Sequence, residues 1–245
     1  MEATDPRRHQ PSRLRLSAAL IGCILLATLQ IPVASVTDVV NPPGRLLELW
    51  PQSLLWAGIS GIWFLGVHMI YRKLQNVTHQ AEVFESVPPP PPFFEDHRHV
   101  TAALWLGVSA VLCTVILPPM LVGQWTLQPV LTWQGLYGTY GMAGLVAAVG
   151  LLLYHGGFGA VTALALAIVQ ALADTVGRTA WFSKVPMGGV VVGLAAATYQ
   201  SATGGWAMFV TTLVAFTLLG AVHLLTGRRL RWTVPATAMT LVFLY

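Results

Sequence analysis

Residues 142–176 read MAGLVAAVGLLLYHGGFGAVTALALAIVQALADTV, and this stretch decides the class of fold. Asp174 is its only acidic or basic side chain apart from His155. A run of 18 or more apolar residues with so little charge is typical of a helix that crosses a lipid bilayer, because a helix satisfies its backbone polar groups internally. Gly156-Gly157 divides the stretch near its middle. We therefore predict two membrane helices here, over about 141–155 and 158–176.

The composition of the whole chain agrees with a membrane protein. Of its 245 residues, 55% are hydrophobic and 9% are charged, and the mean hydropathy is +0.67. Soluble domains carry about 25% charged residues, so this chain has too few charges to cover a soluble surface. The formal charge of +4 does not indicate nucleic-acid binding, because the cations flank apolar runs and form no basic stripe among aromatics. The sequence predicts an all-α, polytopic transmembrane helix bundle.

Apolar runs predict about seven spans and one shorter segment. The predicted spans cover residues 14–36, 53–71, 100–122, 141–155, 158–176, 187–201 and 206–225. Pro118-Pro119 is expected to kink or end the third span, because proline removes a helix hydrogen bond. Residues 123–140 carry the aromatic side chains of a lipid–water interface and are expected to hold an interfacial or re-entrant piece. Residues 233–245, about 20 Å long as a helix, are too short to cross a core of roughly 30 Å and are expected to be tilted, interfacial or truncated.

The polar segments divide the chain into four parts. These are a basic tail (1–13), two membrane helices (14–71), a polar proline-rich loop (72–99) and a bundle (100–245). Arginines in the tail predict a cytoplasmic N-terminus, because cytoplasmic segments carry an excess of Lys and Arg. Seven spans would then place Arg228, Arg229 and Arg231 outside, against the same rule. Either one span is miscounted or the first helix dominates the orientation.

Two stretches of the bundle resemble each other. Residues 142–157 read MAGLVAAVGLLLYHGG, and residues 187–205 read MGGVVVGLAAATYQSATGG. Both run from Met through small and apolar residues to a Tyr and then to Gly-Gly, and an aromatic-led apolar run follows each. We therefore expect two helical hairpins, in which small residues such as Gly189 and Gly193 let helices approach closely. Related repeats of transporters hold their site at the repeat interface; two unrelated hairpins under the same lipid constraint are the alternative.

Ionisable groups inside a span are costly, which makes them candidates for function. Asp174 is the one acid clearly within a span, and Arg178 lies one turn later on the same helix face. An ion pair that closes the helix is the simplest interpretation; a carboxylate that responds to protons or cations is the alternative. A substrate or ion pathway between the two hairpins would use Asp174, Arg178, Tyr154, Tyr199, Gln200 and His223.

Histidines supply a second candidate chemistry, because neutral imidazole binds haem iron, copper and zinc. His68, His155 and His223 lie at helix ends, and no two of them share a helix at i, i+4 spacing. A second group flanks the run of prolines at 88–92 and comprises His79, Glu82, Asp96, His97 and His99. Haem, copper or another divalent metal are the cofactors that these residues could hold. Structural histidines and an ordinary solvated loop are the alternatives.

Three functions stay open on the sequence. The leading hypothesis is a permease-like protein, or the membrane subunit of a transport system, for a small solute or ion. The alternative is a haem- or copper-binding membrane subunit of an oxidoreductase or monooxygenase complex, and a further alternative is a non-catalytic assembly or scaffold subunit. The expected partners are the lipid bilayer and either other membrane subunits or a second copy of the chain. No Walker loop is present, so ATP hydrolysis would need a partner subunit.

Overall fold

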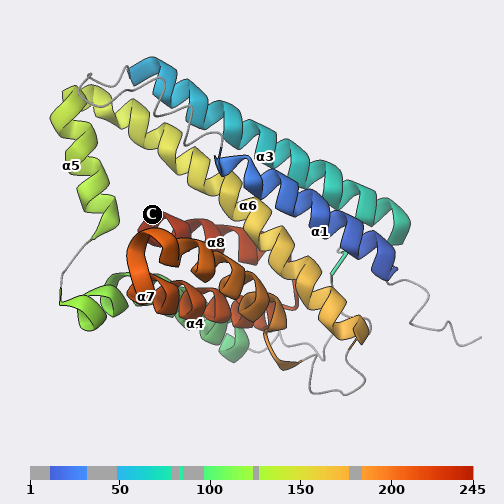
Figure 1. The fold of residues 1–245 in the computed structure, drawn as a ribbon. Helices are drawn as coiled ribbons and strands as arrows, with labels where there is room; N and C mark the ends of the chain where they lie inside the picture. Colours follow the sequence, from blue (N-terminus) through green and yellow to red (C-terminus); the bar gives the residue numbers. More distant parts are fainter. Residues whose placement is uncertain are drawn as a thin grey trace, which may run out of the picture.

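A computed structural model describes residues 12–31, 49–78, 83–84, 97–123, 127–176 and 184–244. In these ranges the fold is all-α without strands, as Figure 1 shows. The seven helices are α1 (Arg13–Thr28), α3 (Leu49–Thr78), α4 (His97–Val122), α5 (Gln128–Tyr140), α6 (Gly144–Val176), α7 (Met187–Leu225) and α8 (Leu230–Leu244). A short 3₁₀ turn, η2 (Gly141–Ala143), joins α5 to α6.

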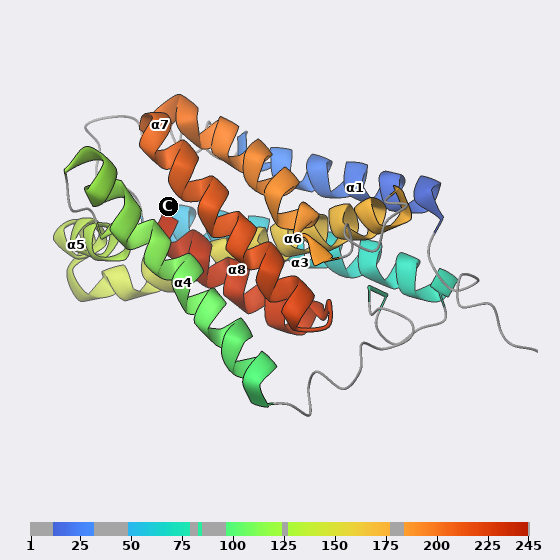
Figure 2. The ribbon, with the colours of Figure 1, turned by 90° about the horizontal axis from the view of Figure 1, so that it is seen from below.

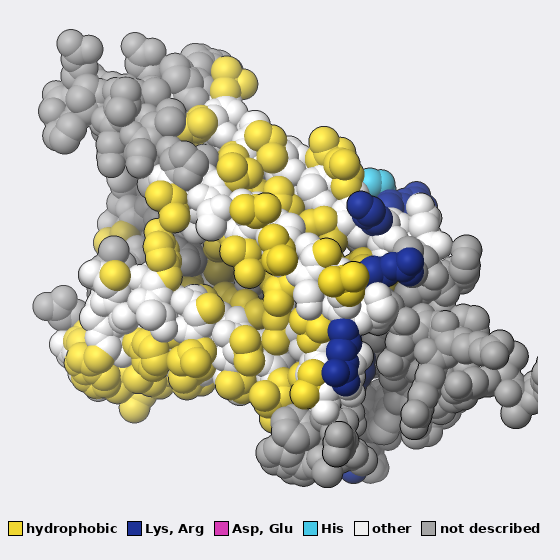
Figure 3. Space-filling view, turned by 45° about the vertical axis from the view of Figure 1, so that its right-hand side comes forward, with side chains coloured by type: hydrophobic (Ala, Val, Ile, Leu, Met, Phe, Trp, Pro, Cys, Tyr) yellow, Lys and Arg dark blue, Asp and Glu magenta, His cyan; other side chains and the backbone are white. Residues whose placement is uncertain are grey.

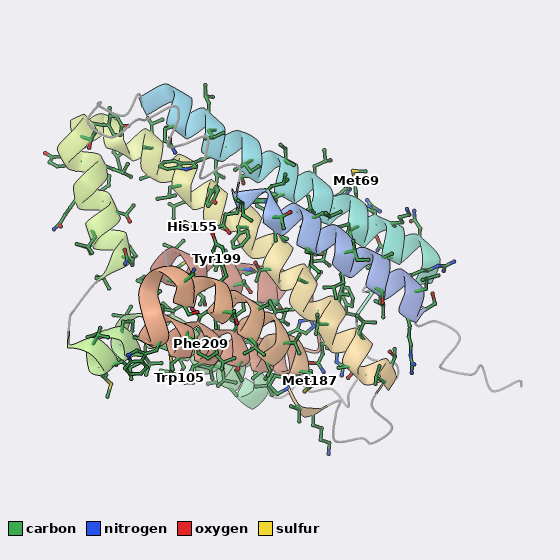
Figure 4. The ribbon with its side chains drawn as sticks, viewed as in Figure 1. Met69, Trp105, His155, Met187, Tyr199 and Phe209 are labelled. Carbon is green, nitrogen blue, oxygen red and sulfur yellow. The ribbon has the colours of Figure 1, made fainter. Side chains whose placement is uncertain are left out.

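Within these described ranges, four stretches are long and apolar enough to cross a membrane: Gln52–Asn76, Thr101–Val122, Gln128–Val176 and Gly204–Leu225. Their outer faces are apolar as well. Met69 on α3 is 63% exposed and Trp105 on α4 is 66% exposed, and both point away from the bundle (Figure 4). Large apolar side chains exposed along whole helices are unfavourable in water and favourable in lipid. These faces therefore indicate contact with a bilayer and a multi-span membrane protein.

The central helix is α6, which runs without a break for 33 residues, about 50 Å. The prediction of two spans joined at Gly156-Gly157 is therefore wrong, and so is the prediction of two successive hairpins. The glycines serve helix packing instead of a turn. A Cβ atom on Gly157 would lie 3.0 Å from the Cα of Ser60, and one on Gly150 would lie 3.4 Å from the Cα of Ser53. The contact residue on α3 moves from Ser53 to Ser60 as the one on α6 moves from Gly150 to Gly157. The helices α3 and α6 therefore run parallel.

The second predicted hairpin is present within α7. At Gly205 the backbone adopts φ 67° and ψ −164°, a region open essentially to glycine. The chain reverses there, so that residues 187–204 and 206–225 run antiparallel (Figure 2). A Cβ on Gly189 would lie 2.8 Å from the Cα of Gly220. The predicted helices over 187–201 and 206–225 and the close helix approach at Gly189 are confirmed, and the second of these helices is also long and apolar enough to cross a membrane.

The remaining helix bounds differ from the predictions in smaller ways. α1 covers most of the first predicted span, whose residues 32–36 lie outside the described ranges. α3 and α4 each extend into the predicted polar loop, and α4 continues about one turn beyond Pro118-Pro119. α5 folds back on α6 at Gly141 (Figure 1), and the interfacial or re-entrant position expected for residues 123–140 stays a prediction.

The C-terminal helix α8 is short and apolar, as predicted for residues 233–245. It packs against α4, α6 and α7. Its inner face is fully buried and consists of Thr233, Thr237, Thr240, Leu241 and Leu244. The hydroxyl of each threonine donates to the carbonyl four residues earlier. This leaves the methyl groups to pack, which explains how a short threonine-rich helix is accommodated at the centre of the bundle.

Trp63 joins three helices at the core. Its side chain is fully buried, and its Nε1–H donates to the carbonyl of Leu26 on α1 at 2.7 Å. On the other side its ring packs on Tyr154 and Phe158 of α6, at centroid distances of 4.9 and 5.2 Å. Trp63 of α3 therefore holds α1, α3 and α6 together in the core.

The Lys and Arg side chains that the structure describes gather at one end of the molecule, which we call the basic end. The start of α1 lies there beside the end of α6, because Arg13 donates to the carbonyl of Thr175. The end of α3 lies on the same side of the molecule, because α3 runs parallel to α6 with Ser60 beside Gly157. Figure 3 shows dark-blue cations along one edge of the apolar surface. These cations are Arg13, Arg15, Arg72, Lys73, Lys184, Arg228, Arg229 and Arg231.

Candidate functional site

A polar cluster at the basic end is centred on Asp174. Its Oδ2 lies 2.5 Å from a guanidinium nitrogen of Arg228, and the two side chains are only 13% and 16% exposed. Gln170, one turn earlier on α6, donates to Oδ1 of Asp174 at 3.3 Å and accepts the N–H of Gly188 at 3.0 Å. The cluster therefore fixes the end of α6 to the beginning of α7 and to the turn that follows α7.

Arg228 reaches Asp174 from an unusual backbone conformation. Its φ is 64°, directly after Gly227 at 66°. Its N–H donates to the carbonyl of His223 at 2.8 Å and so caps the end of α7. A left-handed conformation in a residue with a side chain costs on the order of 1–3 kcal/mol, and the ion pair offsets part of this cost. The predicted neighbour Arg178 lies outside the described ranges, whereas Arg228 comes from 54 residues further along the chain.

His223 lies close to this cluster and links α7 to α8. The side chain is fully buried, and its Nδ1 lies 2.9 Å from the Oγ1 of Thr233. Its Nε2 has no hydrogen-bond partner in the part of the chain that the structure describes. The contact with Thr233 fits the structural interpretation of this histidine.

A cavity of about 360 Å³ lies between α1, α6 and the two halves of α7. We call it the α1–α6–α7 groove. Its walls are almost entirely apolar and include Cys23, Ala27, Val161, Ala165, Val192 and Ala196. The polar side chains on its lining are uncharged: Thr28, Gln30, Thr162 and Tyr199. The surface of the groove is therefore apolar with a few hydroxyl and amide groups.

The predicted pathway residues divide into two groups. Asp174 and His223 belong to the basic end, as described above. Tyr199 is 53% exposed and lines the groove, and Tyr154 lies close to Tyr199 and to the side chain of Gln30. Gln200 is buried next to Tyr199 in sequence. Met187 stands at the start of α7, beside the Gly188 that Gln170 of the Asp174 cluster binds. Figure 4 shows Tyr199 toward the opposite end of the first half of α7, so the groove group and the Asp174 group are separated along this helix.

The predicted metal ligands are not brought together where the structure describes them. His155 is buried and lines a cavity of about 130 Å³ with Trp133 and Leu136 of α5 and Val242 of α8, whereas His68 is exposed on α3. No three His, Cys, Asp or Glu side chains that could hold a metal ion are grouped within the described ranges. The other predicted ligands lie outside what is described, in whole or in their side chains: His79, Glu82, Asp96, His97 and His99.

Three residues of these sites were missed from the sequence. Gln170 stands four residues before Asp174, a spacing that places both on one helix face and could have identified it. Arg228 is 54 residues from its partner, and Gln30 meets Tyr154 from a different helix. No pattern in the sequence predicts either of these contacts.

The fold and these sites define a helical membrane protein with several candidate spans, an interhelical groove and a neutralised ion pair at one end. Comparisons with protein-family models, with curated proteins and with solved structures find no match.

Proposed function

We propose that this protein is a permease-like membrane protein, or the membrane subunit of a transport system, that takes a small apolar or amphipathic solute into the α1–α6–α7 groove. The observation that carries the proposal is the groove itself. Its volume of about 360 Å³ falls in the range of small-molecule sites, which are mostly apolar with a few polar groups. As a transport subunit, the chain would work with other membrane subunits or with a second copy of itself.

The lining favours an uncharged or amphipathic solute over an ion. Among the described residues, no charged side chain lines the groove, and an ion that entered it would lose its hydration without compensation. Asp174, the acid first considered for an ion pathway, is neutralised by Arg228. Gln30 and Tyr199 are suited to hold a polar head group of the solute, and the apolar walls to hold its carbon skeleton.

The proposal includes a cytoplasmic N-terminus. Because α6 is one helix, the chain crosses between the two ends in α1, α3, α4, α6 and both halves of α7 before it reaches Arg228. An even number of crossings keeps Arg228 on the same side as the N-terminal arginines. This removes the conflict that seven spans created with the excess of Lys and Arg expected on the cytoplasmic side.

Orientation is tested by labelling with a membrane-impermeant maleimide. In a variant without Cys23 and Cys113, Lys184→Cys is expected to react only after the cells are permeabilised. Gln134→Cys on α5 is expected to react in intact cells. The reverse pattern would show that the basic end faces outward.

The groove is tested with a diazirine-bearing, alkyne-tagged palmitic acid as the probe. Photolabelled peptides are expected from the α1 and α7 segments that line the groove, such as those containing Ala27 and Ala196. Ala196→Phe fills the groove and is expected to reduce this labelling about tenfold. Val149→Phe, on an exposed face of α6 outside the groove, is the matched control and is expected to leave it unchanged. Even labelling of all apolar faces, unaffected by Ala196→Phe, would contradict the site.

Transport is tested with the solute that the protein itself retains. Compounds that co-purify in detergent are extracted and identified by mass spectrometry, and their uptake into sealed proteoliposomes is then measured. Uptake is expected with the wild-type chain and with Val149→Phe but not with Ala196→Phe. A retained solute that is bound but never taken up would support a binding subunit and contradict the permease.

A further inference from the structure

The α1–α6–α7 groove is a gap between two helices that lie on a third. The helices α1 and α7 each pack along α6, and among the described helices no comparable packing joins α1 to α7. Figure 1 shows α6 running between α1 and the first half of α7. The floor of the groove is therefore α6, and its two sides are α1 and α7.

The open side of the groove lies at the lipid-facing surface. Ile24 of α1 and Val191 of α7 line the groove from its two sides, and each is about half exposed. Exposed apolar side chains of a membrane protein lie against the acyl chains of the bilayer. A molecule that is dissolved in the bilayer can therefore enter between α1 and α7 without passing through water.

The two sides of the groove run in the same direction. The start of α1 lies at the end of α6, where Arg13 donates to the carbonyl of Thr175. The start of α7 also lies there, because the N–H of Gly188 donates to the side chain of Gln170. Both α1 and the first half of α7 therefore run antiparallel to α6 and lead away from the basic end.

These directions give the groove two different ends. The end nearer the basic end is apolar and includes Val169 of α6 and Val191 of α7. The far end is lined by Phe158 of α6, by Tyr199 of α7 and by Gln30, which follows α1. Phe158 and Val169 are 11 residues apart on one helix, so the groove is about 16 Å long.

The amide of Gln30 and the phenol of Tyr199 supply the hydrogen-bonding capacity of the far end. Tyr154 lies close to both side chains. The other two polar side chains of the lining, Thr28 and Thr162, donate their hydroxyl protons to carbonyls of their own helices at 2.8 and 2.9 Å. Because no described side chain of the lining is charged, the far end favours a hydroxyl or carbonyl group over a carboxylate or an ammonium.

We propose that the groove binds a single-chain, uncharged lipid from the bilayer, of the class of long-chain alcohols. Its hydroxyl group lies at Gln30 and Tyr199, and its alkyl chain points toward the basic end. The volume of about 360 Å³ is near the lower end of the range of small-molecule sites, which suits one chain and not a two-chain phospholipid. Carbon–carbon bonds are about 1.5 Å long, so a chain of about a dozen carbons spans the groove. This inference rests on the proposed function and specifies its solute.

The test compares competitors for one photoprobe in the full chain, reconstituted in phosphatidylcholine nanodiscs. The probe is dodecanol with a diazirine and an alkyne at the far end of its chain. Unlabelled dodecanol is expected to displace the probe from the groove at a concentration about tenfold lower than dodecyltrimethylammonium or ionised dodecanoate, because the lining offers no opposite charge. Concentrations are compared as mole fractions of the lipid, so that partition into the bilayer does not decide the result.

Two substitutions remove the polar groups of the far end. Tyr199→Phe and Gln30→Leu are each expected to weaken competition by dodecanol about fivefold, because each removes one hydrogen bond. Competition by dodecane, which has no head group, is expected to stay unchanged in both variants. Tyr137→Phe, at an exposed position of α5 outside the groove, is the matched control and should change neither competitor.

The orientation of the chain is tested on the wild type, so it does not depend on the folding of any variant. The probe with its diazirine at the far end of the chain is expected to label the surroundings of Val169 and Val191. A second probe, with the diazirine beside the hydroxyl group, is expected to label those of Phe158 and Tyr199. The reverse pattern would overturn the proposed orientation.

The outcomes separate this inference from the proposed function. Equal competition by dodecanol, dodecanoate and dodecyltrimethylammonium overturns the inference, and so does unchanged competition by dodecanol in both folded variants. If the groove is still labelled in those cases, the proposed function stands with a solute of another class. Labelling of the groove that is no stronger than labelling of the other lipid-facing surfaces would contradict the proposed function itself.

Discussion

The two similar stretches of this chain, residues 142–157 and 187–205, each end in a Gly-Gly pair. The helix continues through the first pair and reverses at the second. Gly156-Gly157 lies inside the continuous helix α6, whereas the chain reverses at Gly204-Gly205 within α7. Both pairs follow an apolar run that contains a tyrosine, and an aromatic residue directly follows each. The residues of the pair do not therefore determine whether the helix continues.

The neighbours of each pair explain the difference. Gly157 lies against the backbone of α3, where the hydroxyl of Ser60 donates to the carbonyl of Leu153 at 2.6 Å. Gly159 approaches α8 in the same way, with a would-be Cβ 2.7 Å from the Cα of Ala238. By contrast, a Cβ on Gly205 would meet nothing within 4 Å. Glycine in α6 provides close approach to other helices, and glycine in α7 provides a backbone conformation; the tertiary partners select between these roles.

The largest effect is expected from Gly157→Val. The new side chain would collide with the backbone of Ser60, which cannot move without separating α3 from α6. We expect a loss of about 3 kcal/mol of stability, measured as a fall in the melting temperature of the detergent-solubilised protein and in its monodisperse fraction. A variant as stable as the wild type would show that α3 does not pack on α6 at this glycine.

Gly205→Ala is expected to have the next largest effect. The space around the residue is open, so the cost comes from the backbone alone and amounts to about 2 kcal/mol. The same thermal measurement checks it, with Gly61→Ala on α3 as the control, because a Cβ there would meet nothing within 4 Å and the backbone has no positive φ. Equal melting temperatures for Gly205→Ala and the wild type would mean that the reversal does not require glycine.

Asp174→Asn tests whether the end of α6 is fixed to the end of α7. The substitution keeps the size of the side chain and removes its charge, leaving Arg228 in a left-handed conformation without its ion pair. Because both side chains are partly exposed, we expect a loss of about 1 kcal/mol. Arg228→Gln should cost a similar amount, and the double variant should cost less than the sum of the two. Additive losses would indicate that the two residues do not interact.

The smallest effect, with opposite sign, is expected from Gly156→Ala. This glycine neighbours Gly157, but its Cβ would meet only the ring of Phe64 at 3.6 Å, an ordinary contact. Alanine favours a helix over glycine, so the variant should gain about 0.5 kcal/mol. If α6 turned at this pair, the same change would destabilise the protein.

The sequence predicted the features that depend on local composition. The helical membrane class follows from the apolar runs, and the α7 hairpin followed from a Gly-Gly between two such runs. The same rule failed at Gly156-Gly157, because the partners of Gly157 on α3 are distant in sequence. The pair of Asp174 with Arg228 and the contribution of Gln30 to the groove depend on the same kind of long-range packing.

The continuity of α6 is tested most directly by a spin-label distance. In a chain without native cysteines, labels at Leu145→Cys and Val176→Cys occupy exposed positions. They are 31 residues apart, which corresponds to about 46 Å along one helix. Labels at Val191→Cys and Leu218→Cys, on the two halves of α7, should lie within roughly 20 Å, although a straight helix would separate them by about 40 Å. A long distance in α6 with a short one in α7 is the predicted result, and a short distance in α6 would contradict the account.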